Sequence, residues 1–224
     1  MGGGDLGPFW LSIRVATLAT AAIVALGLPS ALLLARVRFA GRGLVAGLLA
    51  LPLVLPPTVL GYGLLLMLGR RGPVGGWLRA TLGVSVVFHW SGAVIAAAVS
   101  AFPLFFLTAR SAFEGVDPAL EDAARLLGRG EGSVFFRVTL PLAWRGVAAG
   151  AALAFARALG DFGATLMLAG DIPGLTQTAS LAIYDAVLAE DPGRAVRYSI
   201  LVALASIAAV TLAQRTLPAT GRRS

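Results

Sequence analysis

The chain has 224 residues, of which 58% are hydrophobic and 13% charged, whereas about a quarter of the residues in an average soluble domain are charged. This composition excludes a soluble enzyme or a disordered tail and indicates a membrane-embedded protein. The net charge of +7 does not indicate nucleic-acid binding, because the basic residues lie at the ends of apolar runs, and the lack of cysteine excludes disulfides, thiolate metal sites and cysteine nucleophiles.

The first two predicted spans are uncharged runs long enough to cross a bilayer, which takes about 20 helical residues. The first run, 15–35, has its stronger positive charge on its C-terminal side. A signal peptide has its positive charge in front of a shorter apolar stretch, so this run is predicted to be an uncleaved helix.

The second run, 43–69, contains Pro56 and Pro57. We expect it to be bent or broken near Pro56, because proline removes a backbone donor and clashes with the preceding turn.

Three further spans are predicted at 84–109, 147–169 and 198–213. The last is too short to cross the bilayer by its apolar residues alone. Flanking polar residues must therefore lie at the membrane edge, with their side chains extended toward the interface. The apolar segment 179–189 contains Asp185 and is too short to cross, which leaves a re-entrant or interfacial helix. The sequence therefore predicts an all-α integral membrane protein with about five transmembrane helices, or six if the short re-entrant segment is counted.

Arginine placement predicts the orientation of the chain, because positively charged loops stay on the cytoplasmic side. With the N-terminus outside, 11 arginines fall in inner loops and 5 in outer loops. The outer pair Arg70 and Arg71, directly at a span end, runs against this assignment. We nevertheless expect the N-terminus outside and the C-terminus inside.

The longest inner loop, 110–146, contains one short amphipathic helix. Asp117 can accept hydrogen bonds from the first free amides, Pro118 fits the first turn, and Gly128 lies just past the end. An apolar face is expected to lie across the span ends and a charged face opposite it; the first consists of Leu120, Ala124 and Leu127, and the second of Glu121, Asp122 and Arg125. A second short helix, 133–140, is expected to end at Pro141.

The same loop resembles the cytoplasmic loop of ABC importer membrane subunits. The motif of that family is Glu-Ala-Ala, three residues, Gly, nine residues, Ile, one residue, Leu-Pro. The matching residues here keep every spacing and are Asp122, Ala123, Ala124, Gly128, Val138, Leu140 and Pro141. Asp122 replaces the Glu of the motif and Val138 its Ile, while Glu121 is adjacent. An amphipathic surface helix without a partner is the alternative interpretation.

The resemblance extends over most of the chain from Trp10 onward and is closest to molybdate permeases. The similar stretches are "LPLVLPPTVLGYGLLLMLGRRGPVG", "FARALGDFGATLMLAGDIPGLTQT" and "AIYDAV". The function that this resemblance implies is the membrane-spanning subunit of an ATP-driven importer of molybdate or tungstate, working by alternating access. A sulfate or thiosulfate permease is the alternative, followed by an ATP-independent channel or secondary transporter.

The resemblance also implies the surroundings of the chain. It implies a multi-pass protein of the prokaryotic cytoplasmic membrane, in contact with lipid, a second copy of itself, two cytoplasmic ATPase subunits and an extracytoplasmic oxyanion-binding protein. The transmembrane domain would be 9–217, with 110–146 as its cytoplasmic coupling loop and 1–8 and 218–224 as tails. ATP and magnesium would bind the partner ATPase, with no cofactor or metal on this chain.

The residues themselves agree that ATP is bound elsewhere. The chain has no lysine, so it cannot carry the usual phosphate-binding loop. An intramembrane enzyme would need a nucleophile, an acid and a base at matched depth, and no such set converges here. We therefore expect no catalytic residue.

Two places could line a transport pathway. Pro56, Pro57 and Thr58 form the predicted helix break, and broken helices often line transporter pathways; a simple proline kink is the alternative. Arg157 and Asp161 lie four residues apart, within reach of each other on one helix face. An unpaired charge is costly at bilayer depth, so this pair faces protein or water, either lining the pathway or fixing helix packing.

Overall fold

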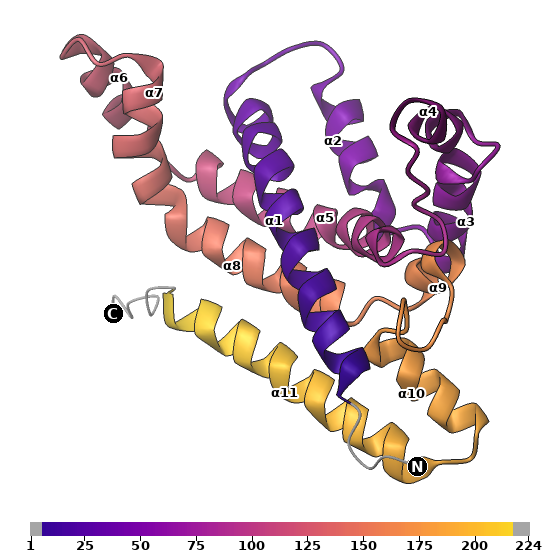
Figure 1. Ribbon diagram of the computed structural model, residues 1–224. Coiled ribbons are helices and arrows are strands. Elements are labelled where there is room, and N and C mark those ends of the chain that lie inside the picture. Colours follow the sequence, from indigo (N-terminus) through magenta and orange to yellow (C-terminus); the bar gives the residue numbers. More distant parts are fainter. Residues whose placement is uncertain (1–5, 217–224) are drawn as a thin grey trace.

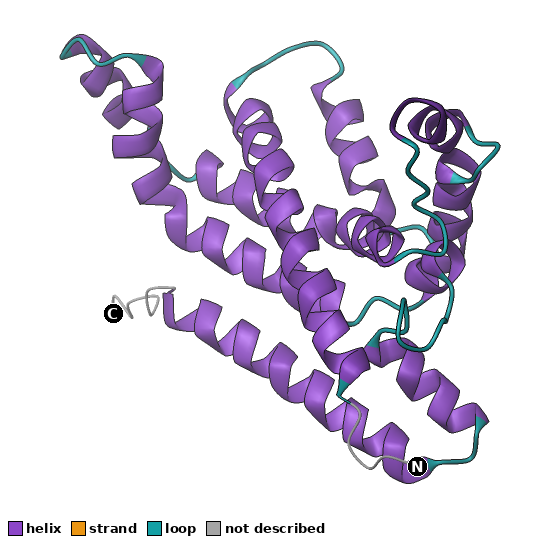
Figure 2. Ribbon diagram, viewed as in Figure 1, coloured by secondary structure: helices purple, strands orange, loops and turns teal. Residues whose placement is uncertain are grey.

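The computed structural model describes residues 6–216, with side chains to residue 212. These residues form helices joined by loops and turns, with no strand among them (Figure 2). Four helical stretches are long and apolar enough to cross a membrane: α1 (Gly7–Arg36), α5 (Trp90–Glu114), the stretch Glu131–Leu159 and α11 (Pro192–Thr216). A bent pair of shorter helices makes a fifth when counted as one span, which confirms the predicted number.

The predicted tails fall largely outside this range. Segment 218–224 and residues 1–5 lie outside the described residues, whereas Gly7 and Pro8 already belong to α1. Proline fits the first turn of a helix because its missing N–H has no partner there in any case.

The bent pair forms where the prolines cluster. α2 (Arg42–Ala50) and the 3-10 turn η1 (Leu51–Leu53) meet α3 (Pro57–Leu68) at a bend of 108°. Pro56 directly precedes α3 and Pro57 is its first residue, and neither can donate the backbone hydrogen bond that would continue the first arm as one helix. The break predicted near Pro56 is confirmed. A further short helix, α4 (Pro73–Leu82), packs beside α3 (Figure 1).

The third span begins later than the sequence indicates. Residues 84–89 were expected to be helical, but α5 starts at Trp90. His89 caps this helix, accepting a hydrogen bond from the Ser91 amide at 3.3 Å, and Phe88 has a positive φ of 57° that no helix accommodates. The start is therefore set by a cap that hydropathy does not report.

The fourth span is shifted toward the N-terminus. The sequence places it at 147–169, but the helix runs continuously through α7 (Glu131–Val134), a π-helical turn (Phe135–Thr139) and α8 (Leu140–Leu159). Pro141 does not end a helix as expected, because the wider π-turn precedes it and relieves the clash between the proline ring and the preceding turn. The chain turns after Leu159, and α9 (Gly163–Ala169) is a separate short helix.

The helix core is built from small residues. α1, α5 and α8 pack around buried alanines together with Phe105, Phe106 and Phe113. Gly146 and Gly150 of α8 lie against α5, where a side chain on Gly146 would collide with Ala112. Small residues allow such close helix approach within a membrane.

α10 (Ala179–Leu188) has 10 residues and packs along α11, at the end of the molecule where α1 begins (Figure 1). It is too short to span, in agreement with the prediction for this segment. The amide of Ala179 donates to the hydroxyl of Ser12 at 2.7 Å, which ties α10 to the first turns of α1. The last span, predicted at 198–213, is part of the longer α11.

Candidate functional site

Several arginines form ion pairs or stack on an aromatic ring near the two ends of α1. At one end, three ion pairs link α1, α2, α5 and the loop that follows; they are Arg36–Glu121 at 2.7 Å, Arg42–Glu114 at 2.9 Å and Arg110–Glu114 at 2.9 Å. At the other end of α1, the guanidinium of Arg14 lies 4.2 Å from the Trp90 ring centre. Three of the arginines counted in inner loops, Arg36, Arg42 and Arg110, thus form ion pairs at the same end of the molecule.

The loop helix α6 (Pro118–Leu126) projects at the first of these ends (Figure 1). The Asp117 carboxylate accepts a hydrogen bond from the Ala119 amide at 2.9 Å, and Pro118 occupies the first turn. Gly128 has a φ of +76° just beyond the helix, a conformation in which a residue with a Cβ is strained. Both predicted ends of the helix are confirmed, because each depends only on local residues.

The buried face of α6 is not the one expected. Glu121, predicted on the charged solvent face, is 4% exposed, whereas Leu120 and Leu127 are 49% and 82% exposed. The Glu121 carboxylate accepts hydrogen bonds from Arg36 and from Thr139, both at 2.7 Å. The buried Glu121 carboxylate therefore anchors α6 to α1 through its ion pair with Arg36 and to the long α7–α8 helix through the hydrogen bond from Thr139, and the leucines of α6 point away from the protein.

A second charged group connects α6 to α7. The Arg125 guanidinium donates to Glu131 at 2.8 Å and to Asp122 at 2.7 Å. These hydrogen bonds, chiefly the one to Glu131, raise the pKa of Arg125 above its usual value. A cavity of about 440 Å³ lies beneath, between the end of α1 and the α6–α7 turn. The ion pairs of Arg125 thus hold α6 and α7 together across the turn at Gly128.

The motif residues not yet described lie on α6 and on the stretch of the long α7–α8 helix that faces it. Asp122 and Ala123 are exposed and Ala124 is half-buried on α6, while Val138 and Leu140 are half-buried and Pro141 is exposed at the beginning of the long helix. A hydrogen bond from Thr139 to Glu121, each adjacent in sequence to a motif residue, brings the two halves of the motif close together. Arg36 and Thr139, which sequence reasoning missed, complete the anchor.

The second candidate region is the helix break. Pro57 begins α3 and lies against Gly163 of α9, where an added Cβ would be 2.8 Å from the Pro57 Cβ. A Cβ on Gly61 would likewise be 2.9 Å from the Cα of Ala164. α3 and α9 therefore touch through glycines, and the break is held against the loop that ends α8.

Arg157 and Asp161 meet beside this break, as their spacing predicts. Arg157 Nη1 lies 3.3 Å from Asp161 Oδ1, and Asp161 Oδ2 accepts from the Thr165 amide at 3.1 Å and the Thr165 hydroxyl at 2.8 Å. The Asp161 side chain is 1% exposed and that of Arg157 is 33% exposed. Asp161 thus holds the first turn of α9 as well as the guanidinium, which explains why the chain turns after Leu159.

A small, partly open cavity of about 110 Å³ lies between the break and this ion pair. Its lining residues are Pro52, Leu53, Leu55, Pro57, Leu60, Ser100 and Arg157. Of the predicted pathway residues, the cavity brings together Pro57 and Arg157, while Pro56 and Thr58 are exposed next to it and Asp161 lies behind Arg157. Ser100 was not predicted, because one serine in an apolar helix carries no sequence signal.

A membrane domain of about five spans, with a capped helix projecting from one end and a proline-broken helix beside a buried ion pair, belongs to the class of polytopic transport subunits. Residues 23–220 match the family described as "Binding-protein-dependent transport system inner membrane component". The chain belongs to this family.

Several relatives match over most of the chain. The molybdenum transport system permease protein ModB of Escherichia coli (strain K12) is 49% identical over 183 residues, 82% of this chain and 79% of the relative. ModB of Haemophilus influenzae is 43% identical, with 88% of each chain covered. ModB of Mycobacterium tuberculosis is 41% identical, covering 92% of this chain and 78% of the relative. Because these relatives are permease proteins, the chain is a permease subunit and not an enzyme.

Solved structures support the fold. The MetNI methionine ABC transporter, in an inward-facing conformation, matches with a TM-score of 0.69 at 17% identity, covering 94% of each chain. A bacterial ABC transporter that imports alginate matches with a TM-score of 0.68 at 18% identity, covering 96% of this chain and 80% of the other. The fold is thus that of ABC importer membrane subunits.

Proposed function

We propose that the chain is the membrane-spanning subunit of an ATP-driven importer of molybdate, with tungstate as an equivalent substrate. The observation that carries the proposal is the identity of 41–49% to molybdenum transport permeases over most of the chain. Sulfate and thiosulfate are less well supported, because the relatives are named for molybdenum. Two copies of the chain would form the pathway, and an extracytoplasmic binding protein would deliver the oxyanion.

The α6–α7 segment is the proposed dock for the two ATPase subunits. Three large apolar side chains are exposed on or directly after α6, namely Leu120, Leu126 and Leu127, and Phe136 is exposed in the π-helical turn that follows α7. Exposed apolar side chains of this kind are expected of a docking surface. The buried pair of Glu121 with Arg36 and the bond to Thr139 would transmit a displacement of α6 to α1 and α8. ATP and its magnesium bind the partners in this proposal, and nucleotide-driven closure turns the pathway outward.

Deletion of the gene tests the substrate. Cells lacking this chain are expected to lose molybdenum-dependent enzyme activity at low external molybdate and to regain it at high molybdate, when slower routes suffice. Molybdenum content, measured by mass spectrometry, should fall in parallel and be restored by the gene on a plasmid. Normal molybdenum content together with a requirement for reduced sulfur would instead favour the sulfate alternative.

The proposed orientation places α6 in the cytoplasm and α4 and the α10–α11 turn outside, in the prokaryotic cytoplasmic membrane. Since the chain has no cysteine, single introduced cysteines can be labelled without background. Ala80→Cys and Ala189→Cys, both at exposed positions, should react with an impermeant maleimide added to intact cells. Gly130→Cys, also exposed, should react only after the membrane is opened. The opposite labelling pattern would reverse the orientation.

A further inference from the structure

We infer that the cavity between the helix break and Arg157 is a binding site for one tetrahedral oxyanion within the membrane domain, with Arg157 and Ser100 as its anion ligands. The inference rests on the proposed function, which it extends from a transport subunit to a particular intramembrane site. It also assigns a role to Ser100, a residue outside the motifs of the sequence.

The Ser100 hydroxyl is the first observation. Ser100 is 2% exposed and lines the cavity, and its Oγ has no hydrogen-bond partner among the described residues. Serine hydroxyls in membrane helices can donate to the carbonyl four residues earlier, as Thr108 does to Leu104 on the same helix at 2.7 Å. A buried hydroxyl left without a partner is unfavourable, so a ligand in the cavity is the partner that this geometry lacks.

The second observation is the charge of Arg157. A guanidinium has five N–H donors, and among the described residues Arg157 forms one ion pair, through Nη1 to Asp161. Asp161 is itself satisfied by both donors of Thr165. It therefore fixes the direction of the guanidinium and leaves its other N–H donors available to the cavity that Arg157 lines.

The rest of the lining suits a small anion. Pro57 places the N-terminal end of the 12-residue α3 at the cavity, and the helix dipole makes that end partially positive. The remaining walls are proline and leucine, whose low polarity strengthens electrostatic attraction relative to water. A cavity needs about 10–15 Å³ to hold one water, so about 110 Å³ has room for a ligand of several non-hydrogen atoms, such as a tetrahedral oxyanion.

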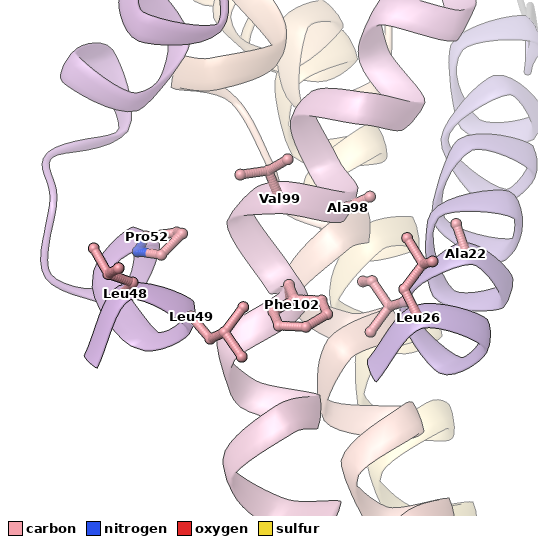
Figure 3. Close-up of a pocket in the computed structure, with 9 residues that line it drawn as sticks. Ala22, Leu26, Leu48, Leu49, Pro52, Ala98, Val99 and Phe102 are labelled. Carbon is pink, nitrogen blue, oxygen red and sulfur yellow. The ribbon is translucent and has the colours of Figure 1, made fainter. Parts of the chain in front are cut away.

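Two other cavities do not combine a hydroxyl without a partner and a cation with available donors. On the other side of Pro52, a groove of about 260 Å³ between α1, α2 and α5 is lined by apolar side chains, as Figure 3 shows for Leu26, Leu48 and Phe102. The cavity beneath α6 contains Arg36 and Arg125, but its lining also includes the carboxylates of Glu121 and Glu131, which repel an anion, whereas no acidic side chain lines the cavity at Ser100. The cavity at Ser100 is where a buried hydroxyl without a partner and a cation with available donors face the same space.

One guanidinium and one hydroxyl make a weak site for a dianion, which suits a transport route. A site along a conduction pathway must bind strongly enough to admit the ion and weakly enough to release it. Tight capture is then left to the extracytoplasmic partner of the proposed function. Removal of either ligand should therefore raise the dissociation constant of the membrane domain without affecting capture outside.

The test measures equilibrium binding of radiolabelled molybdate to the purified complex of this chain with its ATPase subunits, without binding protein or nucleotide. We expect saturable binding by the unmodified complex, about tenfold weaker binding by Ser100→Ala, and no measurable binding by Arg157→Gln. The tenfold figure corresponds to the loss of one charge-assisted hydrogen bond. Ser111→Ala, the same substitution at an exposed position of the same helix, should bind like the unmodified complex.

Thermal stability separates binding from packing. Removal of a hydroxyl that has no protein partner should leave the melting temperature of Ser100→Ala unchanged or higher, even if Arg157→Gln fails to fold. A lower melting temperature with unchanged affinity would make Ser100 a packing residue and overturn the inference. Binding that appears only after phospholipid is replaced by a phosphate-free detergent would assign the site to lipid phosphate and also overturn it.

Failure of this inference is distinguishable from failure of the proposed function. If Ser100→Ala binds molybdate as the unmodified complex does while cells that depend on this chain still accumulate molybdenum, the transport function stands and the site is wrong. If cells without the chain accumulate molybdenum normally, the proposed function itself fails.

Discussion

Glu121→Arg is expected to abolish transport while leaving the chain in the membrane. The substitution removes the partner of Arg36 and Thr139 and brings a second guanidinium against Arg36. Breaking a buried ion pair costs about 3–5 kcal/mol, which is enough to release a helix of nine residues such as α6. Molybdate uptake should fall to background, and copurification of the ATPase subunits should fall with it.

The control variants separate the anchor from surface charge. Asp122→Ala removes a carboxylate that is 66% exposed, and it should retain most uptake because exposed ion pairs contribute little. Glu121→Gln keeps the shape and can still accept hydrogen bonds, so it should give an intermediate rate. The double variant Arg36→Glu with Glu121→Arg should recover part of the uptake. Full ATPase docking by Glu121→Arg would show that the buried pair does not position α6.

Asp161→Ala is expected to remove most of the protein from the membrane. It leaves the Thr165 amide without its carboxylate partner and the Arg157 guanidinium unpaired next to the helix break. The expected destabilisation is about 3 kcal/mol, the lower end for a broken buried pair, because Arg157 retains some exposure. Abundance in purified membranes and the melting temperature of the complex should both fall.

Conservative changes at Asp161 show which contact matters. Asp161→Asn keeps an acceptor for Thr165 and loses the charge, so it should be more abundant than Asp161→Ala. Asp185→Ala is the matched control, because that carboxylate is 42% exposed and pairs with Arg194 on the surface. Wild-type abundance of Asp161→Ala would mean that the ion pair is dispensable for folding and would favour its interpretation as a pathway lining alone.

Features that depend on neighbouring residues could be predicted from the sequence. The number of spans follows from long uncharged runs, and the break near Pro56 follows from proline chemistry. The ends of α6 follow from Asp117 and Gly128, whose effects act within one turn. Each of these properties is local, so no knowledge of the packed structure was needed.

Features that depend on distant contacts could not be predicted. Glu121 was assigned to the solvent face, because its partner Arg36 lies 85 residues away and reaches it only in the folded chain. The fourth span was misplaced, because the turn after Leu159 depends on the hydrogen bonds between Asp161 and Thr165. The sequence stays apolar through this turn, so hydropathy does not reveal it. Ser100 gave no signal, because its significance comes from the cavity and the cation across from it.

The central claim is that this chain carries molybdate across a membrane when partner subunits hydrolyse ATP. Its most direct test is the uptake of radiolabelled molybdate into proteoliposomes that contain the purified complex, with the binding protein supplied on the outer side and ATP enclosed. The account predicts accumulation above the external concentration that requires ATP, is blocked by excess tungstate but not by sulfate, and is lost in Glu121→Arg. Equilibration of molybdate without ATP, or accumulation of sulfate in place of molybdate, would contradict it.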